Sequence, residues 1–383
     1  MTGPIDLDTG VRSRIAVVTG SRAEFGLLAP VMRAVARQPG LELAVVAAGS
    51  HLVSPGLTYR EVKAAFPVAA SVPMQVAGRT GRAADVEALA AGVARFGRAF
   101  EGLRPGWVVV LGDRIEAFAA ASAASVGGFA LAHVHGGDRA EGVADEAMRH
   151  AITKLAHLHL AATAASAERI VRMGEDPARV HVVGSPAVDD LGTIPPADDA
   201  RWADVGEPTA VFVMHPIGRD AETEEAGAAQ VLAALTGERV LALHPNLDAG
   251  REGVLRAIEQ AGGSIVVREH LPRREFVGVL KRLASSGGVV VGNSSAALIE
   301  GAVLGVPAVD VGRRQAGRER CANVVHVEAE RTVAVREGVD AARRIDRASI
   351  THPYGDGRTG ERIAGILAAS FTAPVSLRKQ CAY

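Results

Sequence analysis

The densest group of ionisable side chains lies within residues 111–150 of the 383-residue chain. Asp113 comes directly after an apolar run, and Asp138 and Glu141 follow a second one. Carboxylates that share one end of a sheet raise one another's pKa through repulsion and partial burial. A carboxyl group tuned in this way can remove a proton from carbon or protonate a leaving group. The spacing therefore predicts acid–base chemistry.

Two more acids, Asp145 and Glu146, begin a predicted helix over residues 144–156. These two acids also have a common structural explanation. Acidic side chains in the first turn of a helix interact favourably with the helix dipole. Their closeness in sequence to the other carboxylates keeps them in the candidate site.

Histidines alternate twice along predicted strands, His133 with His135 and His157 with His159. Alternate strand residues point to one face, as metal ligands sometimes do. A zinc site needs a third close ligand and an open position, and only Asp138 is available nearby. We therefore expect no metal, and expect one member of each pair to be a hydrogen-bonded core residue.

The turn TGSRAEFG (19–26) follows the first apolar run and opens a helix. The small residues Gly20 and Ser21 let a ligand approach the backbone at a helix N-terminus, which favours anions. Arg22 adds a charge that can bind phosphate in a bidentate manner. The alternative is an ordinary strand–helix turn with a solvated arginine.

The segment GNSSAALIEGAVLG (292–305) is a second candidate phosphate site. Ser294 or Ser295 suits a helix N-cap, although simple capping would explain them equally well. Glu300, one turn later, can accept hydrogen bonds from ribose hydroxyls. Three arginines follow in the stretch after the next strand: Arg313, Arg314 and Arg318.

Apolar strands alternate with Ala-rich helices along the whole chain, which predicts parallel sheets covered on both faces. We therefore predict an α/β protein with two Rossmann-like doubly wound domains. Ligands in such sheets bind beyond the carboxyl ends of the strands. The predicted strands cover residues 15–20, 41–49, 107–113, 129–137, 157–163, 180–186, 210–216, 239–246, 264–270, 289–293 and 307–312. The predicted helices include residues 23–38, 84–100, 115–126 and 144–156.

Residues 191–209 interrupt this alternation with three prolines and several aspartates, so we predict a linker there. The linker separates an N-terminal domain (15–190) from a C-terminal nucleotide-binding domain (210–371). A flexible lead (1–14) and a tail (372–383) complete the division. We expect the active site in a cleft between the two domains.

The composition excludes several other classes of protein. A formal net charge of -1 gives no electrostatic reason to expect nucleic acid as a partner. The two cysteines, Cys321 and Cys381, form neither a disulfide framework nor a CxxC pair. No apolar run is long enough to span a membrane. We therefore expect a cytoplasmic protein.

Several segments, in this order, closely resemble the hydrolysing UDP-N-acetylglucosamine 2-epimerases of sialic-acid and related bacterial pathways. They are TGSRAEFGLL, LGDRIEA, AHVHGGDRAEGVADEAMRHAITKLAHLHLAAT, GSPAVDDL, HPN and VGNSSAALIEGAVLGVPAVDVGRRQAGR. The resemblance runs from about residue 15 to about residue 330. The sequence HVHGGDR at a strand end favours the hydrolysing branch over its non-hydrolysing relatives.

The resemblance implies a GT-B-like arrangement, and elimination of UDP across C1–C2 to a glycal that then adds water with inversion at C2. It implies no metal, no NAD or other cofactor, and a homodimer. It also assigns roles to matched residues. The catalytic ones are Asp113, Asp138, Asp145, Glu146 and His215. The substrate-binding ones are Gly20, Arg22, His135, Glu141, His244, Asn246, Gly292, Asn293, Ser294, Ser295, Glu300 and Arg318.

One residue departs from the family pattern, because Asp138 stands where the family usually has glutamate. The shorter side chain implies a backbone shift or a different nucleotide sugar, since a misplacement of about 1.5 Å can cost roughly 100-fold in rate. Two other functions share the fold: a GT-B glycosyltransferase, and a protein that binds a nucleotide sugar without converting it. The clustered carboxylates favour the epimerase over both.

Overall fold

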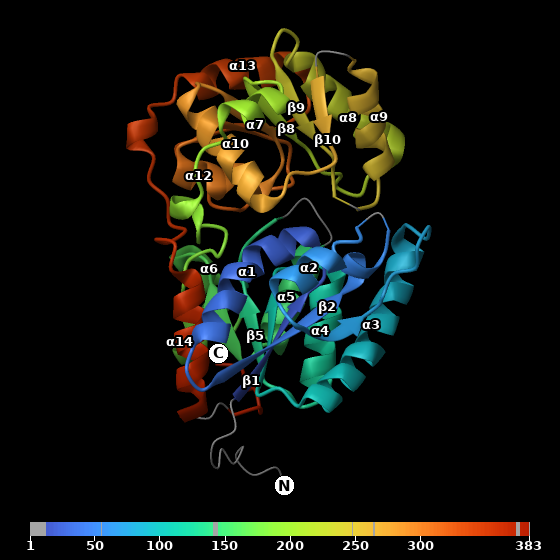
Figure 1. The fold of residues 1–383 in the computed structure, drawn as a ribbon, viewed down its shortest axis with the longest axis vertical. Helices are drawn as coiled ribbons and strands as arrows, with labels where there is room; N and C mark the ends of the chain where they lie inside the picture. Colours follow the sequence, from blue (N-terminus) through green and yellow to red (C-terminus); the bar gives the residue numbers. More distant parts are fainter. Residues whose placement is uncertain are drawn as a thin grey trace. The chain divides into compact units, whose positions relative to one another are not determined.

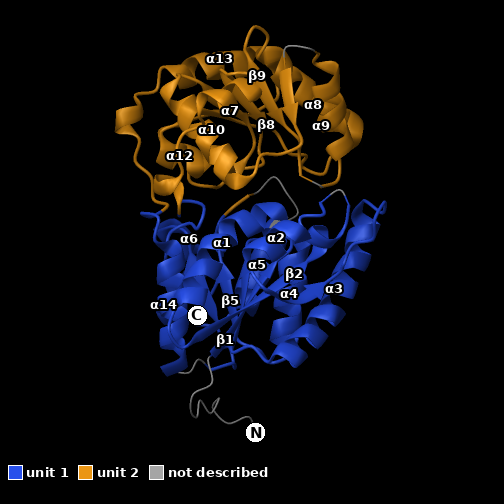
Figure 2. Cartoon of the chain, in the orientation of Figure 1, with its two compact units in different colours: residues 1–138, 145–189, 355–383 blue, residues 139–144, 190–354 orange. Residues whose placement is uncertain are grey.

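The computed structural model describes residues 13–54, 56–140, 145–246, 248–262, 265–372 and 376–382, and the chain divides into two compact units (Figure 2). Unit 1 takes residues 1–138, 145–189 and 355–383, and unit 2 takes residues 139–144 and 190–354. Most of the predicted lead, residues 1–12, lies outside the described residues. Within the described part, no helix has the length and apolar character needed to cross a bilayer.

Unit 1 is built on a seven-stranded parallel sheet with the order β3-β2-β1-β4-β5-β6-β7. Figure 1 shows the sheet among the helices of the unit. Its central strands are buried along their whole length, which is why they read as continuous apolar runs. The strands are β1 (Ser13–Thr19), β2 (Leu41–Ala48), β3 (Val68–Val72), β4 (Trp107–Leu111), β5 (Leu131–Val134), β6 (Leu158–Ala161) and β7 (Val180–Val182).

Helices cover both faces of this sheet because alternate strand residues point to opposite sides. Ile15 and Val17 pack in one buried cluster with α1 and α14, whereas Ala16 and Val18 pack in another with α3 and α4. The helices of unit 1 are α1 (Arg22–Arg37), α2 (Tyr59–Ala65), α3 (Arg82–Leu103), α4 (Ile115–Val126), α5 (Asp145–Leu155), α6 (Ala164–Arg172) and α14 (Thr359–Thr372), with 3-10 turns η1 (Gly49–Leu52) and η2 (Pro177–Arg179).

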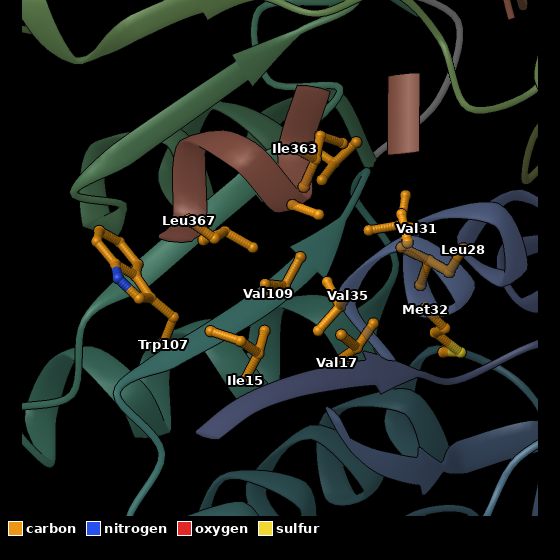
Figure 3. Packing of buried hydrophobic residues seen from close by; sticks show 14 of the residues in the cluster. Ile15, Val17, Leu28, Val31, Met32, Val35, Trp107, Val109, Ile363 and Leu367 are labelled. Carbon is orange, nitrogen blue, oxygen red and sulfur yellow. The ribbon is translucent and has the colours of Figure 1, made fainter. Parts of the chain in front are cut away.

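The last helix, α14, belongs to unit 1 and not to the C-terminal domain predicted over 210–371. Its buried residues Ile363 and Leu367 belong to the same apolar cluster as Leu28 and Val31 of α1 (Figure 3). Asp189 caps the helix, accepting hydrogen bonds from the backbone N–H groups of Thr359 and Gly360 at 3.0 and 2.7 Å. The apolar face of α14 is thus completed by the first unit rather than by its neighbours in sequence.

Unit 2 has a six-stranded parallel sheet with the order β10-β9-β8-β11-β12-β13. The strands are β8 (Ala210–Val213), β9 (Val240–Leu243), β10 (Ile265–Arg268), β11 (Val289–Gly292), β12 (Ala308–Val311) and β13 (Val324–Val327). The helices are α7 (Asp199–Asp204), α8 (Ala221–Ala234), α9 (Arg251–Gln260), α10 (Arg273–Ser285), α11 (Ser295–Leu298), α12 (Glu300–Leu304) and α13 (Thr332–Arg343), with 3-10 turns η3 (Leu191–Thr193) and η4 (Arg347–Ser349).

The segment predicted as a linker, 191–209, is part of unit 2. It contains α7, and its Trp202 and Val205 are buried against β8 and α10 residues in the core of that unit. The prolines that suggested a linker flank this short helix, and the side chain of Asp198 caps its N-terminus.

In each unit the strand order reverses between the first strand and the fourth, so β1 pairs with β4 and β8 pairs with β11. Ligands of doubly wound sheets bind at such a switch point, beyond the carboxyl ends of the strands. The predicted fold class is confirmed, and the topology directs attention to the loops after β1, β4, β8 and β11.

Candidate functional site

The switch point of unit 1 carries three of the predicted residues, and the first, Gly20, lies in the turn between β1 and α1. Ser21 caps α1, its side chain accepting from the N–H of Glu24, and Arg22 is the first residue of that helix. Asp113 lies in the turn between β4 and α4. Because β1 and β4 are paired, the anion-binding turn and this carboxylate follow neighbouring strands.

Arg149, on α5, connects the carboxylates of unit 1. Its Nη2 contacts Asp113, its Nη1 lies 3.6 Å from Glu146 Oε2, and Nη1 also donates to the carbonyl oxygen of Asp138 at 3.0 Å. The arginine is buried, whereas the side chains of Asp113 and Glu146 each keep 18% of their surface exposed. A buried guanidinium thus holds two carboxylates that still reach the surface. We call Arg22, Asp113, Asp138, Glu146 and Arg149 the first rim.

Asp138 has a different environment, since its side chain is only 6% exposed and both oxygens are engaged. Oδ2 lies 2.8 Å from Nδ1 of His135, and Oδ1 accepts from Ser166 Oγ at 2.8 Å. On the other side of the ring, His135 Nε2 lies 2.9 Å from Ser185 Oγ. His135 itself adopts a left-handed backbone (φ 63°), a strained conformation that occurs preferentially at functional sites.

The first histidine pair, His133 and His135, does not form the one-faced pattern expected from the sequence. His133 lies within β5, but His135 lies beyond its end, where the left-handed backbone turns the side chain toward Asp138. His133 is buried between Gly112 O and Thr153 Oγ1, and burial lowers its pKa to about 3.

The second pair is hydrogen-bonded as well: His157 accepts from the backbone N–H of Leu131, and His159 pairs with Glu175. Across the described ranges, no three potential ligands cluster in a way that could hold a metal ion.

The switch point of unit 2 brings together three predicted residues. Asn293 accepts the N–H of His215 at 2.7 Å and donates to its carbonyl oxygen at 2.8 Å. The His215 ring accepts the N–H of Asn246 at Nδ1 (3.1 Å), so Nε2 carries the proton of the neutral ring. Arg314 and Gln315 also donate to the carbonyl oxygen of Asn293.

The chain after β11 turns tightly at Gly292. A Cβ there would lie 2.1 Å from the carbonyl oxygen of Val213, so only glycine fits. Ser294 caps α11, accepting the N–H of Ala296 at 3.3 Å, and Ser295 begins that helix. We call His215, Asn246, Asn293, Ser294 and Ser295 the second rim.

The remaining residues predicted to bind the nucleotide also belong to unit 2. Glu300 is buried and accepts from Arg273 at 3.1 Å. Arg318 donates its backbone N–H to Gln315. His244 follows β9, and burial, with Arg251 nearby, lowers its pKa.

Two predicted residues fall at the limit of the description. Glu141 lies outside the described residues, and Asp145 is described only as the first residue of the α5 backbone. Sequence reasoning missed Arg149, Ser166 and Ser185, which contact the predicted residues directly. The spacing of Arg149 three residues after Glu146 is a signal that could have found it.

The family profile of UDP-N-acetylglucosamine 2-epimerases matches residues 33–368. The chain is 32% identical over 367 residues to a UDP-N,N'-diacetylbacillosamine 2-epimerase (hydrolyzing) of Legionella pneumophila, covering 92% of this chain and 95% of that protein. It is 30% identical over 378 residues to a UDP-N-acetylglucosamine 2-epimerase of Neisseria meningitidis, covering 96% and 98%.

Solved structures agree on the fold. The UDP-GlcNAc 2-epimerase of Methanocaldococcus jannaschii, in complex with UDP-GlcNAc and UDP, superposes with a TM-score of 0.78 at 17% identity, covering 93% of this chain and 99% of that one. The enzyme of N. meningitidis bound to UDP-GlcNAc superposes with a TM-score of 0.76 at 16% identity, covering 93% and 100%. With its sequence relatives, its matching profile and its two doubly wound sheets, the chain belongs to the UDP-N-acetylglucosamine 2-epimerase family.

Proposed function

We propose that this 2-epimerase is of the hydrolysing type, and that it releases UDP and a free 2-epimeric amino sugar from a UDP-sugar. A base removes the proton from C2 while the C1–O bond to UDP breaks, which leaves a glycal. Water then adds across the double bond, with a proton to the opposite face of C2 and hydroxide to C1. The observation that carries the proposal is the pair of partly exposed carboxylates, Asp113 and Glu146, joined by Arg149.

Two carboxylates suit this reaction because it needs one group to accept a proton and another to donate one. Like charges so close repel, and the buried guanidinium of Arg149 offsets that repulsion and fixes both side chains. We propose Asp113, Glu146 and the neighbouring Asp145 as the groups that exchange protons with C2 and with the attacking water.

Asp138 has a positioning role in this proposal rather than the proton-transfer role predicted from the sequence. Both of its oxygens are engaged by His135 and Ser166, so a substrate proton has no direct access to it. The hydrogen-bonded chain Asp138–His135–Ser185 fixes the strained turn after β5. An aspartate fits this role, because a longer glutamate would have to displace Ser166 or His135.

We propose that Arg22 of unit 1 binds phosphate, and that the second rim of unit 2 binds phosphate and the nucleoside. The Ser294 and Ser295 hydroxyls and the backbone N–H groups beside them suit phosphate oxygens. His215 Nε2, with its proton fixed by the Asn246 contact, can donate to the same oxygens. Arg318 and Glu300 are proposed for the nucleotide side, with Arg273 orienting Glu300.

Two sugars are candidates for the substrate. The Legionella relative is named for UDP-N,N'-diacetylbacillosamine and the Neisseria relative for UDP-N-acetylglucosamine, at similar identity to this chain. We propose that the chain acts on a UDP-activated 2-acetamido sugar of one of these two kinds.

The test is incubation of the purified chain with each UDP-sugar in D₂O enriched in ¹⁸O. The proposal predicts UDP without ¹⁸O, because the C1–O bond breaks, and a free sugar with inverted C2 that carries one deuterium there. A glycosyltransferase would need an added acceptor and would leave the C2 hydrogen in place. UDP release without deuterium at C2 would overturn the elimination mechanism.

We also propose that the chain is a cytoplasmic homodimer. The resemblance to the family supports the dimer, and the two unpaired cysteines, Cys321 and Cys381, suit a reducing compartment. Sedimentation equilibrium checks the first proposal, and cell fractionation checks the second.

A further inference from the structure

Glu116 is a fully buried carboxylate that the proposed chemistry does not use. It stands in the first turn of α4, three residues after Asp113, and none of its surface is exposed. Gln75 Nε2 donates to its Oε1 at 2.8 Å, and Arg114 Nε lies 3.6 Å from its Oε2. Within the described chain, Oε2 has no hydrogen-bond partner. Burying a charge with so few partners is costly, so its placement calls for a reason.

Two glycines make room for this side chain. A Cβ on Gly20 would lie 2.4 Å from Cβ of Glu116, and a Cβ on Gly49 would lie 2.3 Å from its Cγ. Gly20 follows β1 and Gly49 follows β2, so Glu116 occupies the space where three neighbouring strands end. Ser50, which follows Gly49, joins the same two turns, since its hydroxyl donates to the carbonyl oxygen of Gly20 at 2.8 Å.

We propose that Glu116 is a positioning residue that ties the Gly20–Arg22 turn to the turn carrying Asp113. The inference rests on the proposed function: Arg22 binds the diphosphate and Asp113 acts at the sugar, so both must keep one spacing along the substrate. Glu116 fills the gap between the two turns and contacts Arg114, the residue next to Asp113.

A second buried acid, Glu24, lies beneath the same turn. Its Oε2 accepts the backbone N–H of Gly20 at 2.8 Å. Burial, together with the negative charge of Glu116, raises the pKa of Glu24 to about 7, while Arg114 and the backbone N–H groups of Gly20 and Ser21 oppose the rise.

The other ionisable groups at this junction are Arg22 and His51. Burial and the charge of Arg22 lower the pKa of His51 to about 4, so the ring is neutral near pH 7. Glu24 therefore changes its charge near pH 7. As the pH rises through this value, Glu24 gains a negative charge under the anion-binding turn, and the affinity for UDP is expected to fall.

The test compares the wild-type chain with Glu116→Gln and Glu24→Gln, using Glu101→Gln on the exposed surface of α3 as a control. Glu116→Gln keeps the size of the side chain but removes its charge. We expect kcat to fall by roughly tenfold or more, because a small displacement of reacting groups has a large effect on rate. The pH-dependent loss of UDP affinity, followed by calorimetry, should move to lower pH in Glu116→Gln and disappear in Glu24→Gln.

A purely structural role for Glu116 would lower the melting temperature without moving the pH dependence of UDP binding, and that result would overturn the inference. So would a Glu116→Gln variant that matches wild type in kcat and in its pH profile. A wild-type chain that releases UDP from neither sugar would instead overturn the proposed function, which separates the two failures.

Discussion

The two units have the same strand order but carry different polar groups where their strands end. The first rim collects carboxylates around one buried arginine, whereas the second rim consists of hydroxyls, amides and a histidine whose tautomer is fixed. The sheet topology determines where a ligand can bind, and the loops determine which chemistry occurs there. The comparison teaches that one scaffold, used twice, can carry a cluster of acids at one set of strand ends and mainly uncharged polar groups at the other, which fits the proposed assignment of proton transfer to unit 1.

The largest effect is expected from Asp113→Asn, which tests whether the carboxylates of the first rim carry out proton transfer. The amide cannot exchange a proton at C2, so turnover should fall by about 1,000-fold or more. UDP affinity should stay close to wild type, because that affinity is assigned to Arg22 and the second rim. The measurements are UDP release and calorimetry with UDP, with the exposed Glu61→Gln as the control. Normal turnover in Asp113→Asn would remove this residue from the mechanism.

Arg149→Met tests whether the buried arginine organises the first rim. Its removal leaves Asp113 and Glu146 without their shared cation, and turnover should fall by roughly 100-fold. The free energy of unfolding should also fall, by about 2–3 kcal/mol, because a partly buried charge loses its partner. Denaturant unfolding and steady-state kinetics measure the two effects. A stable and fully active variant would show that the carboxylates do not depend on this contact.

Glu175→Gln separates acids that act in chemistry from acids that stabilise unit 1. Burial alone would raise the pKa of Glu175, but hydrogen bonds from His159, Lys154 and Lys379 lower it to about 2. The unfolded chain takes up this proton first, so the stabilisation is present above about pH 4.5 and is lost as the pH falls toward 2. The substitution should cost on the order of 3 kcal/mol at pH 7 and much less near pH 2.

The matched control for Glu175→Gln is Glu168→Gln, which removes an exposed ion pair with Arg172 on the same unit. Exposed pairs contribute at most about 1 kcal/mol. Unfolding followed across the pH range gives both values. Equal losses in the two variants, or a Glu175 effect that does not change with pH, would contradict the assignment.

The smallest effect is expected when both Ser294 and Ser295 are replaced by alanine, which removes their hydroxyl groups. They are proposed to bind phosphate equally well in the ground state and the transition state, so KM should rise by about tenfold and kcat should hold. Ser285→Ala, on the exposed end of α10, is the control. A lower kcat at constant KM would show that these hydroxyls act on the reacting atoms and not in phosphate binding. The two rims would then differ less in their chemical roles.

Much of this fold could be predicted from the sequence because buried parallel strands leave a plain signature. The run WVVVLGD and its equivalents predicted the central strands. The edge strands β3 and β13 were not predicted, since their residues are partly exposed and no continuous apolar run marks them. The assignment of α14 to unit 1 was also missed, because an amphipathic helix does not reveal which sheet it covers.

The candidate site was predictable at the level of loops but not of contacts. Asp113 and Asn293 follow strands, so sequence position alone placed them beyond the strand ends. The direction of the Asp138 side chain depends on Ser166 and on the backbone of His135, and neither follows from local sequence. Glu116 was missed for the same reason, because its importance comes from two glycines far away in the chain.

The position of α14 has a consequence for how the chain is made. The strands of unit 1 are synthesised first. The last helix of unit 1, α14, is synthesised only after nearly all of unit 2, which lies between them in the sequence. Until α14 emerges from the ribosome, the apolar cluster around Leu28 and Val31 lacks the part of its cover that Ile363 and Leu367 provide. Unit 2 can therefore finish folding before unit 1. Until α14 has been synthesised, the nascent N-terminal sheet depends on chaperones that bind exposed apolar surface.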